Sequence, residues 1–264
     1  MDLQSMRSIM QMGSSGSVRR IKEEEGISMK KLFAAIVALA LTLCACALAE
    51  GAMSYADFMA AEIDDEVTIE TYVQAHQGWW DNNGTGNVTI YAQDPEGAYF
   101  LYNAVATQEE AEKLVPGTKI RATGYKAEWS GEVEIVEATL EVLDGEYIAE
   151  PEDVTALLGA DELIEKQNRK VCFRGMTVEP IGDAGAAWLY GWDGSGEEGG
   201  DLYFNVSVDG KTYNFTVESY LCGPDTDVYK AVKDLKVGDK IDLEGFLYWY
   251  EGANPHITAI SPAA

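Results

Sequence analysis

Alternating hydrophobic and polar positions recur along the chain from residue 54 onward and predict short β-strands. In the first half, strands are expected over 67–74, 88–92, 98–105, 119–129 and 132–142. A helix capped by Ser54 is expected over 54–61, ahead of the first strand. Thr107 and Glu110 have capping-box spacing and predict a second helix, between the third and fourth strands. The first half is therefore predicted to contain five strands and two short helices.

The second half repeats this order of elements. A helix is expected near Asp161–Lys166, followed after the third strand by another helix near 227–235. Strands are expected over 171–178, 202–208, 213–217, 240–250 and 255–260. Asp209 and Gly210 are a type I′ hairpin signal between the second and third of these strands.

A short motif makes the repeat visible in the sequence. Leu114–Ile120 is followed by Gly124, and Leu235–Ile241 is followed by Gly245, at a constant offset of 121 residues. Two copies indicate tandem domains rather than a solenoid. We expect a first domain over 50–148, a linker over 149–160 and a second domain over 161–264.

Five strands with one helix between the third and fourth is an order that resembles the oligonucleotide/oligosaccharide-binding (OB) fold, a small five-stranded Greek-key barrel. The motif around Lys119, Ile120 and Gly124 resembles the start of the fourth strand in OB domains of bacterial secreted and surface proteins. The resemblance implies a mainly β protein built from two tandem OB-like barrels. It also implies binding at the face of strands two and three and at the loops after strands one and four.

Tryptophan and aspartate stand together in the loop after the first strand of each copy. Aromatic rings stack on sugar rings, and carboxylates accept hydrogen bonds from hydroxyls. The other interpretation is that these tryptophans cap the barrel ends and the polar residues form turns. The candidate ligand-binding residues in these loops are Trp79, Trp80, Asp81, Trp188, Trp192 and Asp193.

The first hairpin adds Tyr91 and Tyr99, which alternation places on its outward side as a candidate stacking platform. Cross-strand aromatic pairing that only stabilises the sheet is the alternative. The aromatic run 246–250 in the second copy must expose some of its rings, and we expect it to make the contact between the domains.

Charge narrows the choice of ligand. The chain has 45 acidic and 19 basic residues and a net charge of −26. Nucleic-acid binding relies on lysine and arginine beside phosphates, so nucleic acid is not favoured. We expect a binding module for carbohydrate or another neutral cell-envelope ligand. A structural or protein-interaction protein is the alternative, and nucleic-acid binding by OB-fold analogy is a weaker one.

Nothing in the sequence indicates catalysis. The two histidines, His76 and His256, fall in different domains, and no nucleophile, zinc, phosphate-loop or dinucleotide motif is present. We expect no enzyme activity, no cofactor and no metal.

An export signal precedes the first domain. Lys30 and Lys31 follow Met29, an apolar run covers 32–43, and Ala47-Leu48-Ala49 is a small-x-small cleavage site. Residues 29–49 are therefore expected to be a signal peptide and 1–28 an upstream extension from a miscalled start. The protein would be bacterial and secreted or at the cell surface.

Cysteines bear on the same compartment. Cys46 lies in a lipobox-like sequence and could carry a lipid, which would be the protein's contact with the membrane. Cys172 and Cys222 remain in the second domain and could pair as a disulfide outside the cytoplasm.

Overall fold

The structure, a computed structural model, describes residues 51–263. The predicted upstream extension, the signal peptide and Cys46 lie outside the described residues. The described residues belong to one compact unit, which contains both sheets.

The first sheet follows a short helix, α2 (Tyr55–Ala60), capped by Ser54 as predicted. A four-residue helix, α3 (Gln108–Ala111), starts at the predicted capping box of Thr107 and Glu110. The strands are β1 (Glu66–His76), β2 (Trp80–Asn82), β3 (Thr85–Gln93), β4 (Ala98–Val105), β5 (Thr118–Trp129) and β6 (Glu132–Glu146).

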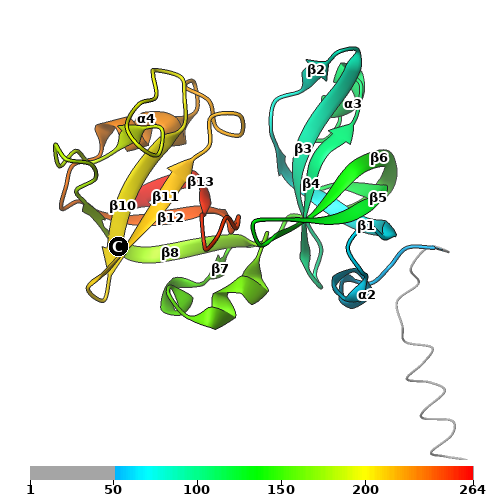
Figure 1. Cartoon of the computed structure of the whole chain (residues 1–264), viewed down its shortest axis with the longest axis horizontal. Helices are drawn as coiled ribbons and strands as arrows, with labels where there is room; N and C mark the ends of the chain where they lie inside the picture. The colour runs from blue at the N-terminus through cyan, green and yellow to red at the C-terminus, as the bar shows by residue number, and fades with distance from the viewer. Residues whose placement is uncertain (1–50, 264) are drawn as a thin grey trace, which may run out of the picture. The chain divides into compact units, whose positions relative to one another are not determined.

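Strand pairing closes the first sheet into a barrel. Its order is β1-β5-β6-β4-β3-β2, and β1 also pairs with β3 (Figure 1). The β4–β6 pair is parallel, whereas the other pairs of the circuit are antiparallel. This is the OB circuit, in which strand one pairs with two and four and strand three pairs in parallel with five. The OB fold predicted for this half is confirmed.

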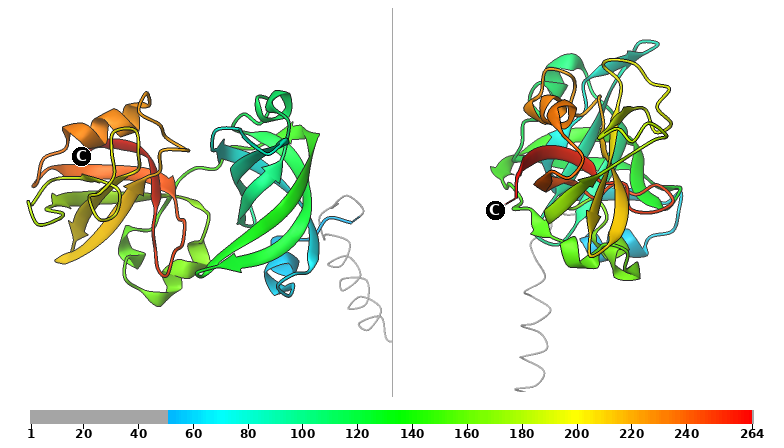
Figure 2. Two further views of the ribbon diagram at one scale, coloured as in Figure 1. Left: turned by 45° about the horizontal axis from the view of Figure 1, so that its top comes forward. Right: turned by 90° about the vertical axis from the view of Figure 1, so that its left-hand side faces the viewer.

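The second sheet has the same circuit through β8, β10, β11, β13 and β12. β8 pairs with both β10 and β12, and the parallel β11–β13 contact joins Thr216 to His256. The strands are β7 (Glu152–Asp153), β8 (Lys170–Glu179), β9 (Leu189–Tyr190), β10 (Leu202–Val208), β11 (Lys211–Val217), β12 (Lys240–Phe246) and β13 (His256–Pro262). The helix α4 (Asp227–Asp234) buries Val228, Tyr229 and Val232 and lies over one end of this barrel (Figure 2).

The repeated motif has a physical cause in both barrels. Gly117 and Gly238 both have positive φ, and their N–H groups donate to Val73 O and Val178 O, each at 2.8 Å. Gly124 and Gly245 lie where the register shifts against β6 and β13, and a Cβ at either would collide with the neighbouring backbone. The repeat thus marks a turn and a bulge that require glycine.

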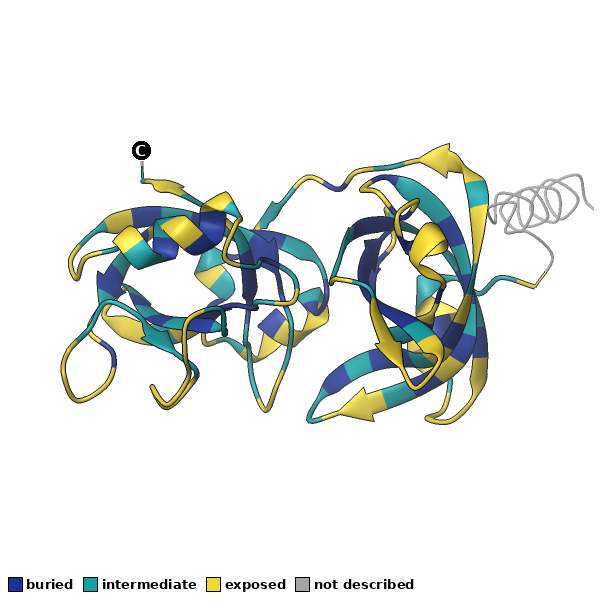
Figure 3. Ribbon diagram, turned by 90° about the horizontal axis from the view of Figure 1, so that it is seen from above, coloured by how far each residue is buried: buried dark blue, intermediate teal, exposed yellow. Residues whose placement is uncertain are grey.

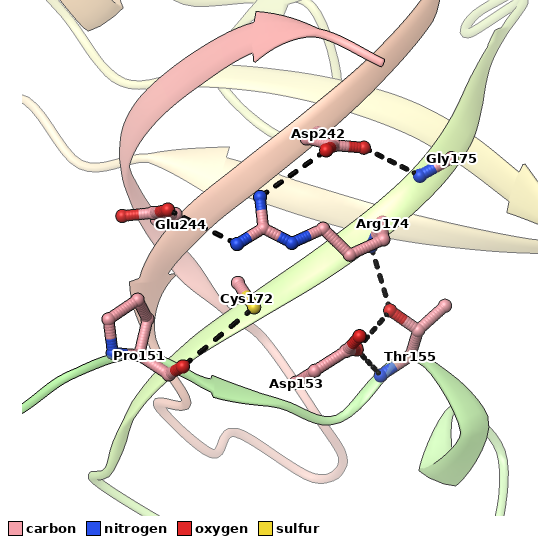
Figure 4. A network of polar contacts seen from close by, with 8 residues as sticks. All are labelled: Pro151, Asp153, Thr155, Cys172, Arg174, Gly175, Asp242 and Glu244. Carbon is pink, nitrogen blue, oxygen red and sulfur yellow. Dashed lines mark hydrogen bonds and ion pairs between the residues drawn. The ribbon is translucent and has the colours of Figure 1, made fainter. Parts of the chain in front are cut away.

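Residues 152–158, predicted as part of a linker, belong to the second barrel. β7 pairs in parallel with β8, and Val154 and Leu158 join the core. Figure 4 shows Thr155 Oγ1 accepting from the N–H of Arg174, whose side chain also contacts Asp242. The predicted helix at Asp161–Lys166 is a 3-10 helix, η2, preceded by another, η1 (Thr155–Leu157).

Each barrel has its own apolar core. Along most strands, buried and exposed residues alternate in the way a barrel wall requires (Figure 3). β3 departs from this pattern because it is buried on both faces from Asn87 to Gln93. The outward face of β3 is therefore covered by something other than the first core.

Candidate functional site

The outward face of the β3–β4 hairpin is covered by the second barrel. Tyr91 is fully buried, stacks on Phe246 with ring centroids 4.6 Å apart, and its hydroxyl lies 2.6 Å from His256 Nδ1. Tyr91 was predicted to be part of an exposed stacking platform, and this is wrong. It faces out of its own barrel, but Phe246 and His256 cover it.

Tyr99 was expected on the same outward side, and here the predicted face is wrong. Ala92 pairs with Tyr99 and Tyr91 with Phe100, so Tyr99 points into the first core and Phe100 points out. The next outward residue on β4 is Tyr102, which is 46 % exposed. Residues directly opposite in an antiparallel pair share a face. The pairing of Gln93 with Ala98 across the turn was the signal that could have identified Phe100 and Tyr102.

The aromatic run of the second copy makes the predicted contact between the domains. Phe246 is buried in a cluster with Tyr91 and Phe100, and Tyr248 packs against this cluster. Tyr248 also stacks on His256 at 4.5 Å. Burial lowers the pKa of His256 to about 4, so the imidazole is neutral at pH 7.

A second contact between the barrels is polar. The β5–β6 turn places Glu132 against the loop after β12, where its Oε2 accepts the N–H of Trp249 at 2.8 Å. Gln167 accepts the N–H of Val133 at 2.9 Å and donates to Gly131 O at 2.7 Å. Burial is the main cause that raises the pKa of Glu132 to about 8, and its Oε1 has no partner within the described part of the chain.

Beside these contacts lie two adjoining cavities, which share Gln77 and Tyr102. The first, called here the tryptophan cavity, has a volume of ≈ 600 Å³. It is lined by Gln77, Gly78, Trp79, Trp80, Tyr102, Asn103 and Tyr220. The second, called here the glutamate cavity, has a volume of ≈ 440 Å³. It is lined by Gln77, Phe100, Tyr102, Trp129, Glu134, Glu218, Tyr248 and His256.

The loop after β1 supplies two of the predicted residues to the tryptophan cavity. Trp79 is half-buried and donates its indole N–H to Ala106 O at 2.8 Å, while Trp80 is 42 % exposed. Trp79 packs so closely on Gly86 that a Cβ there would collide with the indole. Trp79 is therefore a fixed wall of the cavity, and Trp80 is available for contact with a ligand. Asp81 is exposed and forms a turn by accepting the N–H of Gly84.

The matching loop of the second barrel does not line either cavity. Trp188 is half-buried and donates to Lys233 O at 3.3 Å, whereas Trp192 is 76 % exposed. Asp193 accepts the N–H of Ser195 in a turn. The structure thus brings Trp79 and Trp80 together with Tyr102 and Tyr220, but it leaves Trp188, Trp192 and Asp193 apart from them. Tyr220 gave no sequence signal, because it enters the cavity from a turn after β11.

The glutamate cavity holds two carboxyl groups in different states. Glu218 accepts hydrogen bonds from Gln77 Nε2, Tyr220 N and Leu221 N. Glu134 is 8 % exposed and has no hydrogen-bond or ion-pair partner among residues 51–263. Burial raises the pKa of each to about 7. In the part of the chain that the structure describes, neither cavity is lined by a lysine or an arginine.

The two cysteines of the second barrel are both free and buried, so the possible disulfide is not formed in the structure. The Sγ atom of Cys172 on β8 lies 3.9 Å from Pro151 O (Figure 4). Cys222 packs in the core of the second barrel. Burial raises the pKa of Cys222 to about 11, which makes it an inert thiol.

Within residues 51–263 there is no group of three or more His, Cys, Asp or Glu side chains arranged to hold a metal ion. None of the helices in this range has the length and apolar character needed to cross a membrane.

Comparison with known proteins gives no family for this chain. No family model matches it, and no curated protein matches it. A murine DNA-binding protein bound to double-stranded DNA is similar in structure, with 12 % identity, a TM-score of 0.35, and coverage of 75 % of this chain and 96 % of that one. The tetrameric p202 HIN2 domain is similar too, with 10 % identity and a TM-score of 0.31. That alignment covers 77 % of this chain and 96 % of the HIN2 chain.

A chain of the replication protein A heterotrimer bound to single-stranded DNA is also similar, with 10 % identity and a TM-score of 0.31. The alignment covers 74 % of this chain and 49 % of that one. The OB assignment of this chain comes from its own strand pairing.

Proposed function

We propose that this protein is a non-catalytic binding module and that its ligand is a neutral, ring-containing molecule of the carbohydrate class. The observation that carries the proposal is the tryptophan cavity. It combines exposed rings of Trp80, Tyr102 and Tyr220 with the side-chain amides of Gln77 and Asn103. Rings provide flat apolar contact, and amides can both donate to and accept from hydroxyl groups.

Size and charge support the same class of ligand. A cavity of ≈ 600 Å³ lies in the range of ordinary small-molecule sites, so one or two sugar rings would fit. The acidic chain and the absence of cationic lining residues among those described disfavour phosphates. With export as predicted from residues 29–49, the ligand would be a cell-envelope or extracellular glycan.

The other two functions remain as competing outcomes. A purely structural role suits Tyr91, Tyr99 and Trp79, which are buried or held by the barrel, but it leaves the exposed Trp80 and Tyr220 without a task. Of the three similar structures described above, one holds double-stranded DNA and one holds single-stranded DNA, so DNA of both forms is the competing ligand to test.

Calorimetry or a glycan array with the purified protein tests the proposal. Trp80→Ala and Tyr220→Ala should each weaken glycan binding by about fivefold or more, if one ring contact contributes about 1–3 kcal/mol, as it does for bases stacked on aromatic side chains. Trp192→Ala is the matched control, because it removes an exposed tryptophan outside the cavity. Binding of DNA but no glycan, or equal losses in all three variants, would refute a glycan site in this cavity.

A further inference from the structure

The glutamate cavity is walled by four aromatic rings that come from both barrels. Phe100 and Tyr102 stand on β4, Trp129 ends β5, and Tyr248 follows β12. Phe100 lies edge-on to Tyr248 at 5.2 Å and close to Tyr102 at 6.4 Å. Trp129 is 60 % exposed, so the cavity can be reached from solvent.

Glu134 lies in this aromatic cavity without a partner. More than nine-tenths of the residue is buried, and no donor or cation among residues 51–263 contacts its carboxyl group. A buried carboxyl group is normally hydrogen-bonded or ion-paired, because desolvation is otherwise uncompensated. The other carboxyl group, that of Glu218, already accepts three hydrogen bonds. Glu134 is therefore the carboxyl group of this cavity that lacks a hydrogen-bond partner within residues 51–263.

We propose that the glutamate cavity binds an organic cation of the alkylammonium class, with the charged head between the faces of Phe100, Tyr102, Trp129 and Tyr248 and beside the carboxylate of Glu134. Rings attract a cation through their negative faces, and this attraction is strongest for a desolvated, weakly hydrated ammonium group. A metal ion is not favoured, because no three His, Cys, Asp or Glu side chains of residues 51–263 are arranged to hold one. The inference concerns a different cavity from that of the proposed function and does not depend on it.

A cation in the cavity must compete with protons for Glu134. Burial raises the pKa of Glu134 to about 7, so about half of the empty sites are ionised at pH 7. The other titratable groups facing the cavity or adjacent to it are Tyr102, Glu132, Glu218, Tyr248 and His256. His256 is neutral above about pH 4, and Glu218 titrates near pH 7 in the same direction as Glu134. Binding should therefore strengthen as pH rises from 6 to 8 and should release protons.

Calorimetric titration of the purified protein with choline, compared with its neutral isostere 3,3-dimethylbutan-1-ol, tests the inference. Choline should bind at least tenfold more tightly than the alcohol at pH 8. Its affinity should fall about tenfold at pH 6, because the ionised fraction of a group with this pKa falls by about that factor. Equal affinity for the two compounds, or no choline binding at millimolar concentration, would overturn the inference.

Variants separate this site from the tryptophan cavity. Glu134→Gln keeps the shape of the side chain and should weaken choline binding at least tenfold and reduce its pH dependence to the part that Glu218 contributes. Glu128→Gln, an exposed carboxyl on β5, is the control and should change neither. Trp80→Ala should reduce glycan binding but leave choline binding intact, so failure of one proposal is distinguishable from failure of the other. If the Glu134→Gln variant melts at the same temperature as the parent protein, a loss of choline binding is not caused by unfolding. Unchanged choline binding in that variant would refute the role of Glu134.

Discussion

Replacing Glu132 by glutamine should change how the stability of the protein depends on pH. The side chain is 0 % exposed, and one oxygen accepts the N–H of Trp249 while the other has no partner within residues 51–263. Burial is the main cause that raises its pKa from 4.5 to about 8. Between these two values the folded protein keeps a proton that the unfolded chain has released. The stabilisation that protonated Glu132 contributes is therefore fully present below about pH 4.5 and is lost as the pH rises from there through 8.

The size of the effect follows from the pKa. Each unit corresponds to about 1.4 kcal/mol, so the full difference is about 5 kcal/mol if nothing relaxes when the carboxyl ionises. Water entry and small movements reduce this, and we expect about 2–3 kcal/mol. Glutamine stays neutral and still offers an acceptor to Trp249. At pH 9 the Glu132→Gln variant should therefore be more stable than the parent protein by about 2–3 kcal/mol.

Urea unfolding of both proteins at pH 5, 7 and 9 measures this difference. Glu134 and Glu218, whose pKa values are also raised, act in both proteins and cancel in the comparison. Glu128→Gln controls for the removal of one negative charge from an acidic chain, and its stability should run parallel to that of the parent. If Glu132→Gln also runs parallel to the parent between pH 5 and 9, the buried carboxyl does not titrate as argued and the reasoning is wrong.

Three further changes test the junction and the barrels. Tyr91→Phe leaves the buried His256 nitrogen without its hydrogen-bond partner. It should lower the free energy of unfolding, measured by denaturant titration, by about 1–3 kcal/mol. An unchanged free energy would argue against this hydrogen bond. Gly245→Ala places a Cβ against the backbone of β13 and should lower the melting temperature or prevent folding, whereas a wild-type melt would contradict the tight bulge. Trp79→Phe loses the indole hydrogen bond to Ala106 O. It should lower the free energy of chemical unfolding by about 1 kcal/mol. A variant as stable as the parent protein would show that this bond does not hold Trp79 in place.

The strand order could be predicted from the sequence because its signals are local. Alternation, the capping box at Thr107 and the repeated glycines each depend on a few neighbouring residues. The error at Tyr99 was also local, since the turn from Asp94 to Gly97 fixes that Gln93 pairs with Ala98. Correct use of that pairing would have placed Tyr99 inside the barrel.

The burial of Tyr91 has a different origin, which no local pattern contains. Its hydrogen-bond partner His256 is 165 residues away, and the contact exists only after both barrels have formed. The glutamate cavity has the same origin, because Glu134 comes from one barrel and Tyr248 from the other. Sequence alternation shows which side chains point outward from a barrel, but it does not show what covers them.

The contact between the barrels explains why two similar domains carry different surfaces. The first barrel uses the outward face of strands two and three, with Tyr91 and Phe100, while the second uses the ends of its fourth and fifth strands, with Phe246 and His256. Such a contact is heterologous, because equivalent positions do not meet. Tyr125 holds the position of Phe246 in the first copy and is 42 % exposed, whereas Phe246 is 3 % exposed.

Because the contact is heterologous, the second barrel keeps its own hairpin face uncovered. That face carries Tyr203, Asn205, Thr212 and Asn214 in place of the aromatic pair of the first barrel, and its residues are half-buried or exposed. These polar side chains can hydrogen-bond to water, whereas exposing Tyr91 and Phe100 would place large apolar rings in water. The same asymmetry leaves Trp192 in solvent while Trp80 borders a cavity. The proposed ligand site therefore lies at the junction of the two barrels, and the second copy of the tryptophan loop does not duplicate it.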